Sequence, residues 1–223
     1  MQLFYDIFRV FGIVSGYPIG LLFFKTKTYY QNGNAPKLKK IKGGALIISN
    51  HFHAMDYVHN AFLFFPRKLY VVAGEIAFRN FWITLGMKFW GGIQANRVTK
   101  DMSFIQKSAD LMRKGKLVQI FPEGRNTDDG KLQAFYPSYI TMALSGEAPI
   151  IPIICDGTYS LFKRTSIMVG EPIDLWEILN GKEPTRENID MLNQRIHTLC
   201  LELQNELAIR IAQRKNKKNT KGR

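Results

Sequence analysis

The chain has 223 residues, of which 46% are hydrophobic and 22% are charged, and this balance excludes a disordered or collagen-like protein. One domain of this length buries roughly 70% of its unfolded surface, so its core needs neither disulfides nor a metal. The net charge of +13 lies at the two ends, because residues 51–209 carry as many acids as bases. That distribution favours an anionic membrane surface as partner and argues against nucleic acid, which a basic folded face would bind.

Residues 1–30 contain an apolar run that is too short to span a membrane. From Val10 to Phe24 no residue is charged, but three glycines and a proline interrupt the run. A transmembrane helix needs about 20 apolar residues, and the small-residue cleavage site of a signal peptide is missing. We expect residues 1–30 to form a membrane-interface helical segment, with a helix that covers the sheet as the alternative. A polar linker follows over residues 31–42.

Residues 43–180 alternate short apolar runs with longer amphipathic ones. This pattern predicts an α/β domain with a mostly parallel central sheet flanked by helices, and its sites lie outside the carboxyl ends of the strands. The expected strands are Ala45–Ser49, Leu69–Ala73, Gly92–Ala95, Leu117–Phe121, Ile150–Ile154 and Ser166–Val169. The expected helices are Tyr57–Phe65, Ala77–Lys88, Asp101–Lys114 and Pro137–Ser145.

The C-terminal part of the chain predicts one long helix. Over residues 185–213, apolar side chains from Ile189 to Ile211 recur at spacings of three and four, which is typical of an amphipathic helix. We expect this helix to rest on the domain, and contact with lipid is the alternative. Residues 214–223 form a basic tail, which is either attracted to a membrane or a frayed, solvated helix end.

The first strand of the domain runs into the polar sequence NHFHAMD. On a continuous helix His51 and Asp56 would lie about 140° apart, so they meet only if the chain turns between them. The Asp56 carboxylate could then hold one imidazole nitrogen and leave the other as a base for an alcohol proton. Such pairs also occur as helix caps or core groups, so this motif alone is weak evidence.

Three further predicted strands carry charged residues, glycine or proline at or near their ends. The run FPEG ends a strand with Glu123 and Gly124, and Arg125 follows directly. Arg97 follows the strand GIQA, and a guanidinium at such a position matches phosphate oxygens. The run PIIPI holds two prolines, which argue for an edge strand or a bend.

Four blocks thus follow one another along the chain: HX4D (His51 to Asp56), GGIxxxR (Gly91 to Arg97), FPEG (Phe121 to Gly124) and PIIPI (Pro149 to Ile153). With these blocks in this order, the sequence resembles glycerolipid acyltransferases of the 1-acyl-glycerol-3-phosphate acyltransferase (PlsC-like) family over about residues 40–175. The resemblance implies that residues 43–180 form an acyltransferase domain. It implies that His51 is the general base and Asp56 its orienting partner. It further implies that Arg97 binds the acceptor phosphate and that Glu123 and Gly124 shape the acceptor site.

The reaction that the resemblance implies is attack of a lipid hydroxyl on the thioester of acyl-CoA or acyl-carrier protein. No metal, no other cofactor and no covalent enzyme intermediate is expected. The expected acceptor is 1-acyl-glycerol-3-phosphate, which gives phosphatidic acid in phospholipid biosynthesis. The expected location is the cytoplasmic face of the cell membrane, in peripheral or monotopic attachment.

Two departures from the family pattern concern the acceptor. Arg125-Asn126-Thr127 stands where the family usually has Thr-Arg-Ser, and Tyr136 stands where a lysine usually follows the phenylalanine. Arg125 is expected to supply part of the missing positive charge in the acceptor site. A different hydroxyl-bearing lipid as acceptor therefore stays open.

Two other classes of function remain as alternatives. His51, His53, Asp56 and His59 are similar to a dinuclear metallohydrolase loop, but the spacing differs by one residue and too few ligands are present. His53 and His59 are therefore expected to be ordinary side chains. A non-catalytic lipid-binding protein is the second alternative.

The two cysteines have no paired or metal-binding spacing, which indicates reduced core residues of a cytosolic protein.

Overall fold

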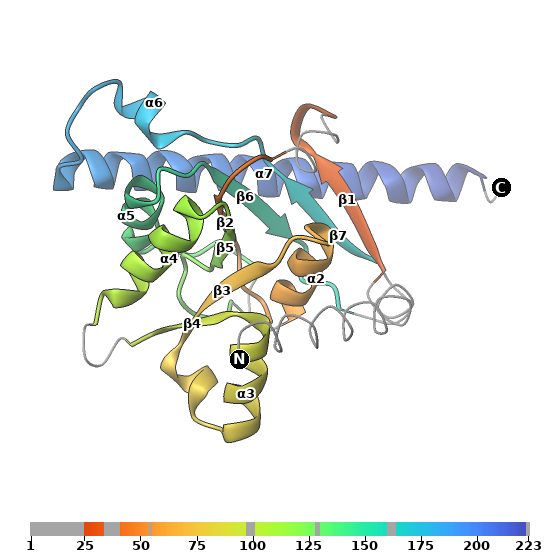
Figure 1. The fold of residues 1–223 in the computed structure, drawn as a ribbon. Helices are drawn as coiled ribbons and strands as arrows, with labels where there is room; N and C mark the ends of the chain where they lie inside the picture. The colour runs from red at the N-terminus through yellow and green to blue at the C-terminus, as the bar shows by residue number, and fades with distance from the viewer. Residues whose placement is uncertain are drawn as a thin grey trace.

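The structure is a computed structural model that describes residues 25–33, 41–53, 55–96, 101–127, 130–159 and 164–221. These residues form a seven-stranded sheet with helices on both faces (Figure 1). The strands are β1 (Thr26–Tyr30), β2 (Ala45–Ser49), β3 (Leu69–Gly74), β4 (Gly92–Ala95), β5 (Leu117–Ile120), β6 (Ile150–Cys155) and β7 (Thr165–Val169). Their order is β1-β7-β6-β2-β5-β3-β4, and the β6–β7 pair is antiparallel while the other pairs are parallel. The prediction of a mostly parallel α/β sheet is confirmed.

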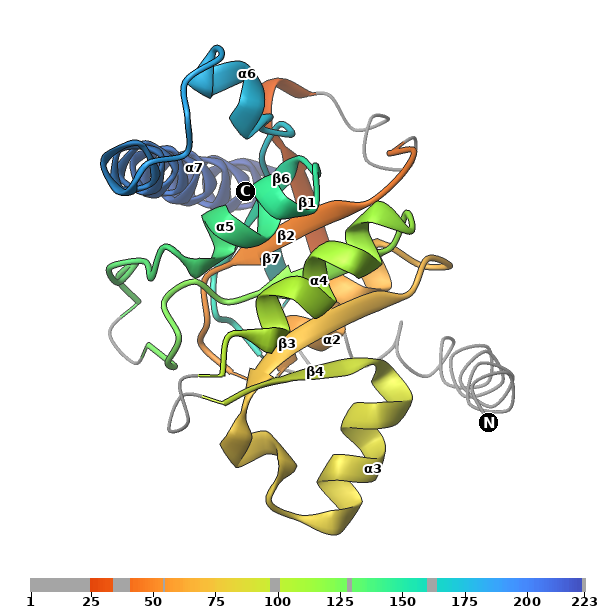
Figure 2. The same ribbon diagram turned by 60° about the vertical axis from the view of Figure 1, so that its left-hand side comes forward.

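The helices of the described residues cover the two faces unequally (Figure 2). On one face lie α4 (Ser103–Arg113), α5 (Ser138–Ser145) and the long α7 (Arg186–Lys221). The other face packs against α2 (Met55–Leu63). Short elements complete the fold: the 3₁₀ turn η1 (Gln31–Gly33), the 3₁₀ turn η3 (Glu75–Phe78), α3 (Phe81–Trp90) and α6 (Leu175–Leu179).

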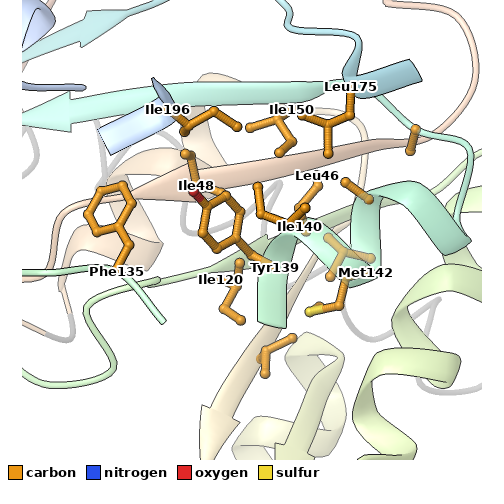
Figure 3. Close-up of a cluster of buried hydrophobic side chains, with 14 of the residues drawn as sticks. Leu46, Ile48, Ile120, Phe135, Tyr139, Ile140, Met142, Ile150, Leu175 and Ile196 are labelled. Carbon is orange, nitrogen blue, oxygen red and sulfur yellow. The ribbon is translucent and has the colours of Figure 1, made fainter. Parts of the chain in front are cut away.

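Strand β2 lies at the centre of the core and explains the continuous apolar run of its sequence. Leu46 and Ile48 pack on the face of α5 and α7, whereas Ala45 and Ile47 pack on the face of α2. Figure 3 shows the first of these clusters, in which Tyr139 of α5 lies among side chains of the sheet. A strand that is buried on both faces has no polar face, as in parallel sheets generally.

Residues 26–30 correct the expected helical segment of residues 1–30. They form β1, which pairs in parallel with β7 at the edge of the sheet. Threonine and tyrosine favour extended backbone, and the first residues of this strand are exposed as an edge permits. The remainder of the expected segment, residues 1–24, lies outside the described residues.

Strand β6 corrects the expectation of an edge strand or a bend at PIIPI. It lies between β2 and β7 and is buried throughout. The carbonyl of Pro152 accepts the N–H of Gly170 at 2.9 Å, just after β7 ends. The N–H that proline lacks therefore faces the end of β7, so the β2 side of the ladder is not affected.

The expected helix Ala77–Lys88 is divided into two elements. Asn80 separates η3 from α3 and caps α3, because its side-chain oxygen accepts the N–H groups of Trp82 and Ile83. The expected C-terminal helix is present as α7, and it continues through Lys221 into the expected tail. Among the residues that the structure describes, no helix is both long and apolar enough to cross a bilayer.

Candidate active site

The turn between β2 and α2 brings His51 and Asp56 together. Oδ2 of Asp56 accepts the backbone N–H groups of Phe52 and His53, each at 2.8 Å. The same oxygen lies 3.2 Å from Nδ1 of His51. One carboxylate thus satisfies the donors of the turn and reaches the imidazole, so the chain reverses here as the HX4D spacing requires.

The geometry gives the two ring nitrogens of His51 different hydrogen-bonding roles. An ionised carboxylate only accepts hydrogen bonds, so Nδ1–H is the donor to Asp56 and Nε2 carries the lone pair. The Phe121 ring stacks on the imidazole with centroids 3.9 Å apart and planes 16° apart. The His51 side chain is 20% exposed, whereas that of Asp56 is 0% exposed. The pair therefore presents the imidazole, and not the carboxylate, at the surface.

Glu123 holds this turn from the neighbouring strand end. The residue is 1% exposed, and its Oε1 accepts the backbone N–H of His51 at 3.1 Å. Its Oε2 accepts the Thr127 hydroxyl at 2.8 Å and the Gln133 N–H at 2.9 Å. The N–H of Thr127 in turn donates to the His51 carbonyl at 2.8 Å. The FPEG loop and the turn from His51 to Asp56 are thereby joined into one hydrogen-bonded unit.

Gly124 and Arg125 follow at the surface end of the same loop. Gly124 has φ 67° and donates its N–H to the Phe121 carbonyl at 3.0 Å, a turn conformation that favours glycine. The exposed Arg125 donates to the Gln133 side chain at 3.2 Å. Tyr136, at the position of the family lysine, is 62% exposed.

Arg97, which is expected to contact a phosphate, lies outside the described residues. The chain on either side of it is described. β4 ends at Ala95, and Asn96 forms an isolated antiparallel bridge with Asp101. Asn96 therefore follows the carboxyl end of a parallel strand, at the same edge of the sheet as His51 and Glu123.

Asn50 is a further residue of this candidate site, one that the sequence motifs did not indicate. Its side chain donates to the Cys155 carbonyl and accepts the Cys155 N–H, both at 2.9 Å. This pair of bonds ties the residue before His51 to the end of β6. A buried asparagine between an apolar strand and the first histidine was the available signal, but its partner is 105 residues away. Thr127 was missed as well, although it stands where the family motif has serine.

Cys155 and His59 are buried beside the turn. Burial, and to a smaller extent the nearby Asp56, raises the pKa of the Cys155 thiol well above its usual range. The thiol is therefore neutral near pH 7 and is not an activated nucleophile. Burial also lowers the pKa of His59, an effect that Asp56 and Asp156 partly oppose.

The histidines of the metallohydrolase alternative make other contacts in the structure. The rings of His53 and His59 lie 5.8 Å and 5.7 Å from the ring of Tyr159. Within the described part of the chain, no group of three or more His, Cys, Asp or Glu side chains could hold a metal ion. The arrangement that the structure does show is an imidazole with one nitrogen fixed by a carboxylate, which suits proton transfer with an alcohol.

Comparison with known proteins agrees with the motifs. The Acyltransferase family model matches residues 27–156. A 1-acyl-sn-glycerol-3-phosphate acyltransferase of Bacillus subtilis (strain 168) is 29% identical over 172 residues, which cover 74% of this chain and 83% of that protein. The protein of the same name from Borreliella burgdorferi is 28% identical over 60% of this chain and 52% of its own length.

A solved structure supports the fold. The 1-acyl-sn-glycerophosphate (LPA) acyltransferase PlsC from Thermotoga maritima superposes with a TM-score of 0.61 at 17% identity, over 82% of this chain and 73% of that chain. At this identity the likeness concerns the fold, namely a mostly parallel sheet with flanking helices. The family model covers more than half of the chain, and the resemblance of the four motifs is thereby confirmed: the chain is an O-acyltransferase and belongs to the Acyltransferase family.

Proposed function

We propose that the chain transfers a fatty acyl group from a thioester donor, acyl-CoA or acyl-carrier protein, to the free hydroxyl of 1-acyl-glycerol-3-phosphate, and so produces phosphatidic acid. The observation that carries the proposal is the imidazole of His51, held through Nδ1 by a buried carboxylate at the carboxyl edge of the sheet. The names of the relatives support the acceptor, since the proteins from Bacillus subtilis and Borreliella burgdorferi are both 1-acyl-sn-glycerol-3-phosphate acyltransferases.

In the proposed reaction, Nε2 of His51 takes the proton of the acceptor hydroxyl. The hydroxyl oxygen attacks the thioester carbonyl, the new ester bond forms and the carbon–sulfur bond breaks. The leaving thiolate receives the proton from the imidazolium, so that His51 returns to its starting state. Asp56 stabilises the imidazolium and keeps Nδ1 protonated throughout.

The remaining site residues receive roles on the same basis. Arg97 is proposed to bind the acceptor phosphate, and the exposed Arg125 to add positive charge beside it. Gly124 lets the loop turn next to the acceptor. Glu123 is proposed to act by positioning His51, because both of its oxygens are occupied by protein donors.

We also propose that the enzyme works at the cytoplasmic face of the cell membrane in peripheral or monotopic attachment. The acceptor is a lipid, and the basic ends of the chain suit an anionic surface. Helix α7 continues through Lys221 and so extends into this basic tail.

The test is acyl transfer by the purified full chain in the presence of a metal chelator. A mixture of lysolipids and of both thioester donors is offered, and the products are identified by mass spectrometry. We expect phosphatidic acid as the main product. His51→Ala is expected to lower kcat by about 10²- to 10⁴-fold, because a general base contributes that much.

The matched control is His197→Gln, which changes another of the four histidines. His197 lies on α7 and bonds the Gln133 carbonyl at 3.0 Å, a contact that a glutamine amide can replace. A loss below tenfold for His51→Ala, with the protein still folded by circular dichroism, would contradict the role of His51. A different acylated lipid as main product would replace the acceptor and leave the reaction class in place.

A further inference from the structure

Helix α3 and the turn η3 are strongly apolar and yet have no buried residue. The sequence of α3 is FWITLGMKFW, and neither α3 nor η3 contains a buried side chain. Ile76, Phe81 and Trp82 are 73%, 71% and 75% exposed, and Ile83 is 54% exposed. A Cβ atom added at Gly86 would meet nothing within 4 Å. By contrast, α4 buries four side chains. Large apolar side chains that are exposed close together mark an interaction surface.

This surface begins at the edge of the sheet that carries the catalytic turn. η3 follows the carboxyl end of β3 directly, as His51 follows that of β2, and both strands are parallel to β5. α3 then lies beyond β4 at the end of the sheet, as both ribbon views show (Figures 1 and 2). A large apolar partner that contacts η3 and α3 therefore also lies next to the carboxyl edge of the sheet, where the acceptor is proposed to bind.

The charges around the surface select among possible partners. Arg79 and Lys88 are exposed beside the aromatic side chains, and α3 has no acidic residue. Glu75 of η3 is the one acid of the two elements. A second copy of the chain in a twofold contact would bring these like charges together. Exposed Trp and Phe with flanking basic residues suit the boundary of an anionic bilayer.

We propose that η3 and α3 form a membrane-insertion surface, in which the side chains of Ile76, Phe81, Trp82 and Ile83 enter the interface of an anionic bilayer. Arg79 and Lys88 then pair with lipid phosphates. The choice of lipid as partner rests on the proposed function, and the inserted surface holds the catalytic turn next to the bilayer. The acceptor can reach His51 from the bilayer without crossing water.

Tryptophan fluorescence tests the proposal without any measurement of activity. The chain has three tryptophans, Trp82, Trp90 and Trp176. The variant W90F/W176F keeps only Trp82, and the variant W82F/W90F keeps only Trp176, which is 44% exposed on α6 and serves as the matched control. Each full-length variant is mixed with vesicles of phosphatidylglycerol and phosphatidylcholine, with and without brominated acyl chains.

We expect a blue shift and quenching by brominated chains for Trp82 and neither effect for Trp176. Phe81→Ser is expected to weaken vesicle binding about tenfold, since burial of one large apolar side chain contributes at least that factor. An unchanged Trp82 spectrum in the presence of vesicles would overturn the proposal. A Trp82 spectrum that is already blue-shifted and protected from acrylamide without vesicles would overturn it too, because residues 1–24 or a second copy would then cover the surface.

The proposed function can fail or hold independently of this result. Acyl transfer to a short-chain, monomeric lysophosphatidate needs no bilayer, so it reports on the reaction alone. Vesicle binding weakened about tenfold in Phe81→Ser, with unchanged transfer to the monomeric acceptor, is the combination that we expect.

Discussion

At the scale of single residues, Glu123 offers the clearest separation of positioning from binding. Its buried carboxylate accepts three hydrogen bonds, one of them from the backbone of His51. In Glu123→Gln the amide has one acceptor oxygen, so a buried donor loses its partner and the free energy of unfolding falls by about 1–3 kcal/mol. We expect kcat to fall while KM for the acceptor changes little, because His51 is displaced and the acceptor contacts are not.

Steady-state kinetics and urea unfolding of Glu123→Gln give both quantities. Glu177→Gln, an exposed glutamate of α6, is the control for the loss of one charge. A rise in KM for the acceptor at constant kcat would place Glu123 in direct contact with the acceptor and would contradict the positioning role.

The same residues show how far a sequence determines a site. His51 and Asp56 are five positions apart, so local geometry allows them to meet only where the chain turns between them, and the structure contains that turn. The bonds from Glu123 to His51 and from Asn50 to Cys155 join residues 72 and 105 positions apart. These contacts depend on which strands are neighbours in the sheet, and the order of strands is not encoded in any local pattern.

At the scale of elements, burial decides which parts of the fold are predictable. The six strands expected from the sequence all exist; five of them lie between two neighbouring strands and are rich in apolar residues, whereas β4 is an edge strand with an exposed glutamine. β1 was missed because it is a half-exposed edge strand whose polar residues follow an apolar segment. The prolines of β6 gave a wrong expectation because the missing N–H falls where β7 ends, which only the register reveals.

Helix α7 was predicted from apolar side chains that recur at spacings of three and four, and the burial of this apolar stripe can be tested quantitatively. Leu203 is 2% exposed and packs in the core, whereas Leu201, two positions away on the same helix, is 37% exposed. We expect Leu203→Ala to lower the free energy of unfolding by about 2–5 kcal/mol, because it leaves a cavity under the helix. Leu201→Ala is expected to cost less than about 1 kcal/mol.

Urea unfolding followed by circular dichroism measures both variants under the same conditions. Equal losses of stability would mean that α7 is not docked through this stripe. They would favour the alternative in which the apolar face of the helix rests on lipid.

At the scale of the whole molecule, two kinds of surface lie at different places. The apolar surface of η3 and α3 lies beside β4, whereas the carboxyl end of α7 extends past β1 at the opposite end of the sheet (Figure 1). Apolar insertion depends little on ionic strength, but attraction between basic residues and anionic lipid is screened by salt. Salt dependence therefore separates the contribution of the basic tail from that of the apolar surface.

Deletion of residues 214–223 tests the tail, because it removes six basic residues and no acid and lowers the net charge from +13 to +7. Each basic residue near an anionic surface contributes about 1 kcal/mol, so we expect vesicle binding at low salt to weaken at least tenfold. At about 1 M salt the Debye length is only about 3 Å, so the truncated and full-length chains should bind equally, through the apolar surface. Sedimentation with anionic vesicles over a salt series measures both limits. Equal binding at low salt would show that the tail does not reach the membrane, and complete release of both chains at high salt would argue against apolar insertion.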